Sequence, residues 1–242
     1  MRESKMIAVL FICSFIAALI SGAAGFGGSL LLLPVVTACV GAEIAVPVLT
    51  LSQLLGNLSR MTAGWKKIDW KSAGWFSITS LPLAALGAFG FSLLPKDLVT
   101  RCIGLALIIL VIAKLLSGKD LPKGKRTLLI GGAISGGLSG LCGSGGPIGA
   151  AVFLSLDLSP VAYIASEAAT ATSMHILKTI IYSKLTTMTV NSLVIGLTMG
   201  VCMIVGTYAA NHFIKKMNKV RFQKYVAVLL CVVGLYMIIA GV

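Results

Sequence analysis

The chain has 242 residues, of which 57% are hydrophobic and only 11% are charged, and its mean hydropathy is +1.01. Soluble domains carry about a quarter of charged residues, so this composition excludes a cytosolic enzyme, a nucleic-acid-binding protein and a disordered chain. The net charge of +13 comes mainly from basic residues between long apolar segments, as in the cytoplasmic loops of membrane proteins.

The apolar segments predict an all-α polytopic membrane protein, because a helix needs about 20 apolar residues to cross a bilayer. Eight segments are long enough or nearly so: 6–24, 43–64, 70–94, 98–117, 126–142, 161–183, 188–214 and 220–241. Two shorter segments, 27–40 and 146–157, each follow a glycine-rich turn. Each turn joins either two full crossings or a broken helix pair that re-enters the membrane, where protein or a water-filled cavity must cover it.

Basic residues set the expected orientation. Twelve of them lie in three loops, at 66–71, 119–126 and 215–224, and five lie on the opposite side. Because cytoplasmic loops carry the excess of Lys and Arg, we expect the three basic loops in the cytoplasm. Both termini are then expected outside a plasma (inner) membrane that the chain crosses several times, although Arg2 and Lys5 favour the opposite orientation.

The sequence contains an internal repeat with a shift of 118 residues. The shift aligns ISGAAGFGGSL at 20–30 with LSGLCGSGGPI at 138–148, which are identical at five of eleven positions. It also pairs Ser52 with Thr170, Asn57 with His175, Arg60 with Lys178, and Lys66 with Lys184. The halves 1–120 and 121–242 each have five apolar segments, and an odd number predicts two inverted-topology repeats, as in many secondary transporters. A duplication without a transport role is the alternative.

Each glycine turn precedes a short helix. A helix N-terminus exposes free backbone N–H groups and a partial positive charge, and glycine lets a ligand approach them closely. Two such ends that point inward from opposite faces predict one anion site, whereas the alternative is that the glycines only let helices pack. The residues expected to contact the anion here are Gly27, Gly28, Ser29, Ser144, Gly145 and Gly146.

Polar side chains recur with one spacing inside two spans. Asn57 and Arg60 lie three residues apart on one helix face, and His175 and Lys178 repeat this spacing. Charged side chains inside a bilayer usually face a cavity or a partner, so Arg60 and Lys178 are expected to neutralise the anion, with snorkelling to the interface as the alternative. Asn57 and His175 lie deeper and are expected to hydrogen-bond the substrate or a neighbouring helix.

Glu167 is the one carboxylate clearly within a predicted span. A carboxyl group held away from water favours its protonated form, which makes Glu167 a candidate for coupling transport to protons. An ion pair with a basic group and a position close to the cytoplasmic surface are the alternatives.

The sequence lacks the motifs of known enzyme and metal sites. HExxH, GxSxG and P-loop patterns are absent, and His175 and His212 are too far apart in the chain to suggest a metal site. We therefore expect no catalytic residue, no metal, no cofactor and no nucleic-acid partner. The expected partners are a small anion, coupled protons and the lipid bilayer, and a homo-oligomer is compatible with this composition.

The order of these motifs resembles the TauE/SafE sulfite exporter family, also called the toluene sulfonate uptake permeases. The resemblance rests on the paired glycine turns, on Asn57-x-x-Arg60 after the first and on His175-x-x-Lys178 after the second, and it covers essentially the whole chain. It implies a plasma-membrane carrier for sulfite, thiosulfate or sulfonates such as sulfoacetate, in either direction. We therefore expect a secondary transporter that alternates access around the glycine-turn site, with an anion channel as the alternative. An intramembrane enzyme or an assembly subunit is a third reading, for which the sequence shows no clear constellation.

Overall fold

The computed structural model describes residues 2–24, 28–90, 121–143, 145–185 and 189–214, with isolated positions at 105, 108 and between 218 and 239. Within these residues the chain forms α-helices and one 3-10 turn and no strand. The elements are α1 (Arg2–Ala24), α2 (Ser29–Val40), α3 (Ala42–Ala63), η1 (Trp65–Lys67), α4 (Trp70–Phe89), α6 (Lys125–Cys142), α7 (Gly146–Leu154), α8 (Pro160–Leu185) and α9 (Val190–Ile214). The predicted segments 98–117 and 220–241, Gly27 and Ser144 lie outside the described residues or almost entirely so.

For the described residues the prediction of an all-helical chain is confirmed, and each of their eight α-helices matches one predicted apolar segment. Among the described helices, α4 over Trp70–Phe89 and α9 over Val190–Ala210 are long and apolar enough to cross a membrane. The apolar part of α1, Ile7–Gly22, is shorter. The 22-residue α3 and the 26-residue α8 contain the polar residues that the sequence analysis singled out.

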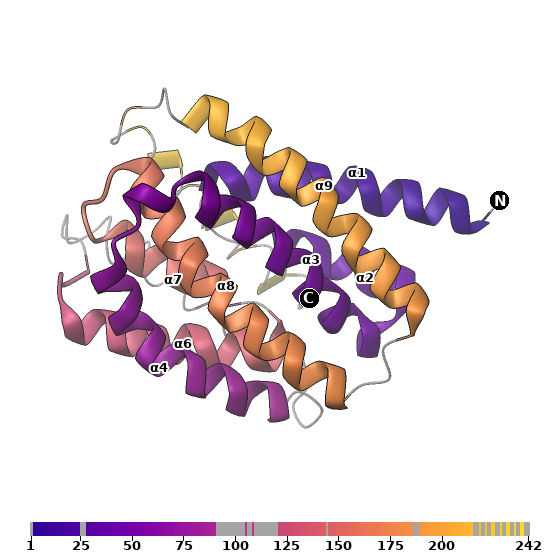
Figure 1. The fold of residues 1–242 in the computed structure, drawn as a ribbon, viewed down its shortest axis with the longest axis horizontal. Helices are drawn as coiled ribbons and strands as arrows, with labels where there is room; N and C mark the ends of the chain where they lie inside the picture. The colour runs from indigo at the N-terminus through magenta and orange to yellow at the C-terminus, as the bar shows by residue number, and fades with distance from the viewer. Residues whose placement is uncertain are drawn as a thin grey trace.

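The helices pack in three neighbouring groups (Figure 1). In the centre, α3 packs against α8. On one side α9 contacts α3 and also packs along α1, and on the other side α4 contacts α8 and also packs along α6. The two central helices therefore hold their polar residues between two outer helix pairs.

Small residues let the outer pairs approach closely. A Cβ atom on Gly136 of α6 would lie 2.2 Å from the backbone oxygen of Ser80 in α4. A Cβ atom on Gly140 would lie 2.3 Å from that of Ala84. In the other pair, a Cβ atom on Gly206 of α9 would lie 2.6 Å from the side chain of Ala18 in α1. Such small-residue faces are typical of helix pairs in membranes, where backbone-to-backbone packing drives association.

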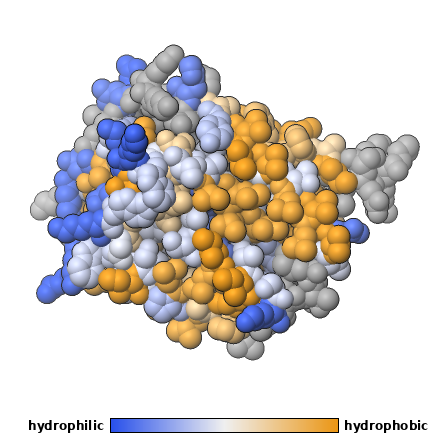
Figure 2. Space-filling model, viewed as in Figure 1, coloured by the Kyte–Doolittle hydropathy of each residue, from blue (hydrophilic) through white to orange (hydrophobic). Residues whose placement is uncertain are grey.

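The first and last turns of several helices meet at one end of the molecule. Because successive glycines of α6 contact successive turns of α4, the two helices run parallel and begin at the same end. That end also carries η1, and its exposed lysines and arginine include Lys66, Lys67, Lys71, Lys125 and Arg126. We call it the basic end. Figure 2 shows hydrophilic residues gathered on the left of the view, where the basic end lies in Figure 1, and apolar residues over much of the rest.

The helix pair α6–α7 is a hairpin. The turn at its tip begins at Gly143, and from there α7 runs back along α6. A Cβ atom on Gly131, early in α6, would lie 2.4 Å from the side chain of Val152, late in α7. The hairpin therefore brings the chain back towards the end where α6 begins, and α8 begins beyond it.

Candidate functional site

Residues from five helices and one turn enclose a small cavity inside the bundle. Its volume is about 10 Å³, close to the minimum that holds one water molecule. The predicted site residues that line it are Ser29, Asn57, Gly145, Gly146, Glu167 and His175. They come from α2, α3, the start of α7 and α8, so the fold brings together residues that are far apart in the sequence.

The turn between α6 and α7 is held at the cavity by glycines and one serine. Gly143, after the last residue of α6, has a φ of +73°, which favours glycine. The Oγ atom of Ser135 donates a hydrogen bond of 2.8 Å to the carbonyl of Gly145. A Cβ atom on Gly145 would lie 2.0 Å from the carbonyl oxygen of Ser135, so a larger residue would push the start of α7 away from α6.

The start of α2 reaches the same cavity from the first half. Gly28 precedes α2, and its carbonyl accepts a hydrogen bond of 3.0 Å from the N–H of Leu32. A Cβ atom on Gly28 would lie 3.0 Å from the Cβ atom of Ala17, so this turn is also closely packed. Because Ser29 is the first residue of α2 and Gly146 the first residue of α7, the N-termini of both short helices meet at one cavity.

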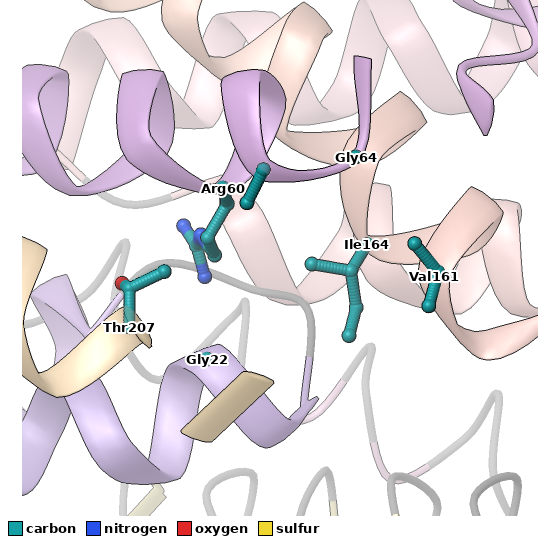
Figure 3. Close-up of a pocket in the computed structure, with 7 residues that line it drawn as sticks. Gly22, Arg60, Gly64, Val161, Ile164 and Thr207 are labelled. Carbon is teal, nitrogen blue, oxygen red and sulfur yellow. The ribbon is translucent and has the colours of Figure 1, made fainter. Parts of the chain in front are cut away.

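Arg60 lies beside the cavity and does not line it. Its Nη1 atom donates a hydrogen bond of 3.0 Å to the carbonyl of Ser21, and its Nη2 atom donates one to Oδ1 of Asn57. Ser21 belongs to the last turn of α1, whose carbonyls have no partner within the helix. Arg60 therefore places a positive charge at the C-terminal end of α1, where the helix dipole is negative. Figure 3 shows its guanidinium between α3, Gly22 of α1 and Thr207 of α9.

Lys178 makes the corresponding contact in the second half. Its Nζ atom donates hydrogen bonds to the carbonyl of Ser139 at 3.1 Å and to its Oγ atom at 2.8 Å. Ser139 belongs to the last turn of α6. In both halves the cation and its partner are 39 residues apart. Arg60 is 3% exposed and Lys178 is fully buried, so neither side chain snorkels to the surface of the bundle.

Glu167 and His175 line the cavity, and each has a buried polar atom without a hydrogen-bond partner among the described residues. These atoms are Oε2 of Glu167 and Nδ1 of His175. Arg60 is close enough to interact electrostatically with Glu167, but no ion pair within contact distance joins the two. A buried polar atom without a partner is costly, so these atoms indicate that the cavity accommodates a polar guest.

Sequence reasoning missed one set of contacts and four cavity residues, which are Ser139, Gly143, Ala171 and Met174. Ser139 and Gly143 belong to the repeated turn motif, which is the signal that singles them out. The hydrogen bonds of Arg60 and Lys178 to the ends of α1 and α6 were also missed. The alignment of the halves already places Ser21 opposite Ser139 and Arg60 opposite Lys178, so the paired contacts follow its register.

One comparison with known proteins gives a match. The model of a family described as sulfite exporter TauE/SafE matches residues 10–237, nearly the whole chain. No curated protein and no solved structure matches the chain.

Proposed function

Since the chain belongs to the TauE/SafE family of sulfite exporters, which are membrane transporters, we propose that it is a secondary transporter for a small sulfur-containing anion. The substrate class is sulfite, thiosulfate or a short sulfonate such as sulfoacetate, carried across the plasma membrane. The observation that carries this proposal is the cavity at which the N-termini of α2 and α7 meet.

The anion binds at the two helix N-termini. Free N–H groups and the positive ends of the helix dipoles favour a negatively charged guest there. The backbone contacts come from Gly27, Gly28 and Ser29 in one half and from Ser144, Gly145 and Gly146 in the other. Asn57 and His175, which line the same cavity from α3 and α8, add side-chain hydrogen bonds.

Arg60 and Lys178 support the anion from behind the cavity. Each lies one helical turn after a cavity residue, Asn57 or His175, and each is anchored to the end of a helix that leads into a glycine turn. Their charges offset the negative ends of α1 and α6, which would otherwise repel an anion at the same turns. They also contribute positive potential to a cavity that contains little water.

The packing of the helices supports two inverted repeats, 1–120 and 121–242, that alternate access around this site. The shift of 118 residues maps α1 onto α6, α3 onto α8 and α4 onto α9. Under this exchange the pair α1–α9 becomes α6–α4, the pair α3–α9 becomes α8–α4, and the pair α3–α8 maps onto itself. A cavity of about 10 Å³ is too small for a sulfonate, so binding and release require the halves to move apart.

The basic end faces the cytoplasm, and both termini lie outside. The starts of α4 and α6 share the basic end, and α9 leads towards it, since Thr207 lies beside Arg60 and Gly64. Two of the three basic loops thus lead into helices that start at the basic end, and the third loop follows α9. The N-terminus of α1 lies at the other end in Figure 1. Cytoplasmic loops carry the excess of Lys and Arg.

Transport is coupled to protons through Glu167. A bound anion would share the cavity with this carboxyl group. Two like charges 4 Å apart repel by about 4 kcal/mol at an effective dielectric constant of 20, so the anion favours the protonated carboxyl. A proton then binds to Oε2 together with the anion and leaves with it on the other side. Arg60 interacts with Glu167 electrostatically without an ion pair, so it offsets only part of the repulsion.

The proposed function is tested with purified protein in liposomes. Labelled sulfoacetate inside the liposomes should exchange for unlabelled sulfoacetate outside, and the reverse, at a rate that saturates with concentration. Sulfite and thiosulfate should compete with this exchange. Protein-free liposomes are the control. An anion channel would instead give single-channel currents in a planar bilayer, and the absence of both exchange and current for all three anions would contradict the proposal.

A further inference from the structure

A hollow opens at the basic end, beside the end of α3. Its volume is about 530 Å³, and it is lined by residues 62–67 of α3 and η1 together with Ser159 and Val161 next to and within α8. Lys66 and Lys67 are exposed there. A hollow bordered by basic residues raises the local concentration of anions.

A second, smaller space adjoins the hollow and reaches Arg60. This cavity of about 20 Å³ shares Ala63, Gly64 and Val161 with the hollow. Arg60 lines its inner side, and Figure 3 shows the guanidinium on one side of this space with Val161 and Ile164 on the other.

Arg60 also connects this space to the anion cavity. Through Nη2 it donates a hydrogen bond to Asn57, which lines the cavity at the glycine turns. The lysines of the hollow, the guanidinium of Arg60 and the amide of Asn57 therefore follow one another from the surface to the site. An anion moving along this series exchanges one set of donors for the next.

The equivalent route in the other half is filled. A shift of 118 residues places Tyr182 where the first half has Gly64, and Ile181 where it has Ala63. The Tyr182 side chain is 1% exposed, and its hydroxyl donates a hydrogen bond of 2.6 Å to the carbonyl of Gly140. Ile181 is buried as well. Gly64, which has no side chain, thus lies beside the open space, and the large side chain of Tyr182 fills the equivalent space in the other half.

We propose that the hollow is the vestibule through which the substrate anion reaches Arg60 and the site from the basic end, and that Tyr182 closes the equivalent route in the other half. The inference rests on the proposed function, because it takes the cavity at the glycine turns as the anion site. When access alternates, the Tyr182 hydroxyl leaves the Gly140 carbonyl and the second route opens.

The first experiment tests the vestibule by labelling cysteines in a variant whose native cysteines are replaced. Ala63→Cys should react with the membrane-impermeant anionic reagent sulfonatoethyl methanethiosulfonate added to the side that carries the basic end. The reaction should block sulfoacetate exchange, and sulfoacetate should slow the reaction. Ser183→Cys, exposed near the other end of α8, is the matched control and should react from the opposite side. Reaction of Ala63→Cys from the opposite side, or no loss of exchange after labelling, would overturn the vestibule.

A second measurement tests the charges of the hollow. Lys66→Gln combined with Lys67→Gln should raise the KM for sulfoacetate several-fold and leave kcat unchanged, and high salt should remove the difference. Lys71→Gln changes an exposed lysine near the same loop that does not line the hollow and should alter neither constant. An equal effect of both changes would assign the lysines to general surface charge and overturn their role.

A third measurement tests the closed route. Ile181→Cys should resist the reagent on both sides, and adding Tyr182→Phe, which removes only the hydroxyl, should make it react several-fold faster from the side opposite the basic end. Tyr208→Phe on the outer face of α9 is the control and should change nothing. An unchanged labelling rate in the Tyr182→Phe background would overturn the closure. If wild-type protein shows no exchange of any tested anion, the proposed function fails, whereas exchange with the wrong labelling pattern refutes only the route.

Discussion

The Nζ atom of Lys178 donates hydrogen bonds to both oxygen atoms of Ser139, at 3.1 Å to the carbonyl and at 2.8 Å to the hydroxyl. The contact fastens the later part of α8 to the last turn of α6, just before the glycine turn that precedes α7. Arg60 fastens α3 to the last turn of α1 by the same logic. Each half of the protein thus has a buried cation that fixes the helix end from which a short helix departs.

Lys178→Ala should abolish binding of sulfoacetate, because it removes the charge and both hydrogen bonds to the end of α6. Each bond to a charged group contributes about 1.5–3 kcal/mol, so the unfolding temperature should also fall clearly. Ser139→Ala removes only the hydroxyl bond and should weaken binding much less. Isothermal calorimetry and thermal unfolding measure the two effects, and unchanged affinity in Lys178→Ala and in Arg60→Ala would remove both cations from the site.

Gly145→Ala should prevent anion binding by displacing the start of α7, because the new Cβ atom would lie 2.0 Å from the carbonyl oxygen of Ser135. Gly137→Ala is the matched control, since a Cβ atom there meets nothing within 4 Å. In a helix interior that change stabilises by up to about 1 kcal/mol, so binding should persist and the unfolding temperature should stay equal or rise. Equal binding by both variants would contradict a role for the turn.

Glu167→Gln should separate anion exchange from proton coupling. In the wild type, sulfoacetate binding should strengthen as the pH falls, because the neutral carboxyl admits the anion and the ionised form repels it. The amide is always neutral, so the variant should bind independently of pH, keep exchange, and lose accumulation driven by a proton gradient. Asp157→Asn is the control and should behave like the wild type. It makes the same change at an exposed carboxylate that pairs with Lys123, and its backbone φ of +63° is one that Asn tolerates. Proton-driven accumulation by Glu167→Gln would refute the coupling.

A pH-sensitive dye inside liposomes tests the same coupling in the wild type, without any variant. Movement of sulfoacetate should carry protons in the same direction, and addition of a protonophore should abolish the pH change. Anion movement without a change in internal pH would exclude Glu167 as the coupling site.

His175→Ala should weaken anion binding and lower stability only through lost packing, without the loss of a hydrogen bond. The Nδ1 atom of His175 is buried and has no partner among the described residues, so its removal breaks no hydrogen bond and relieves an unsatisfied group. Asn57→Ala is expected to lower both properties, because Asn57 accepts from Arg60 and donates to the carbonyl of Gln53. Titration with sulfoacetate and thermal unfolding compare the two variants. A large loss of stability in His175→Ala would indicate a structural role instead.

The sequence predicted the described helices well because apolar length and glycine turns are local signals. The 118-residue shift also indicated which positions correspond, and Ser29, Asn57, Gly145, Gly146, Glu167 and His175 lie at one cavity. The direction of the cations was harder to predict. Spacing places Arg60 on the same helix face as Asn57, but only the packing of α3 against its neighbours determines whether the guanidinium reaches the cavity or the end of α1.

The difference between Gly64 and Tyr182 was not predictable either. In the aligned halves it is one substitution among many, and its meaning depends on the surroundings of each residue. Gly64 lies at the hollow of the basic end, and Tyr182 lies at the carbonyl of Gly140. An alignment of the two halves detects positions that match, so it does not single out a position at which the halves differ. In the proposed route, the difference between Gly64 and Tyr182 determines which end of the molecule is open to the anion.

The glycine contacts between α6 and α4 have a mechanical consequence. The backbones of α4 and α6 are in contact along successive turns, so one helix cannot slide along the other without a steric clash. We therefore expect α4 and α6 to move as one rigid unit, and α1 and α9 as a second. If access alternates as proposed, we expect the moving boundary to lie between these two pairs, where α3 meets α8.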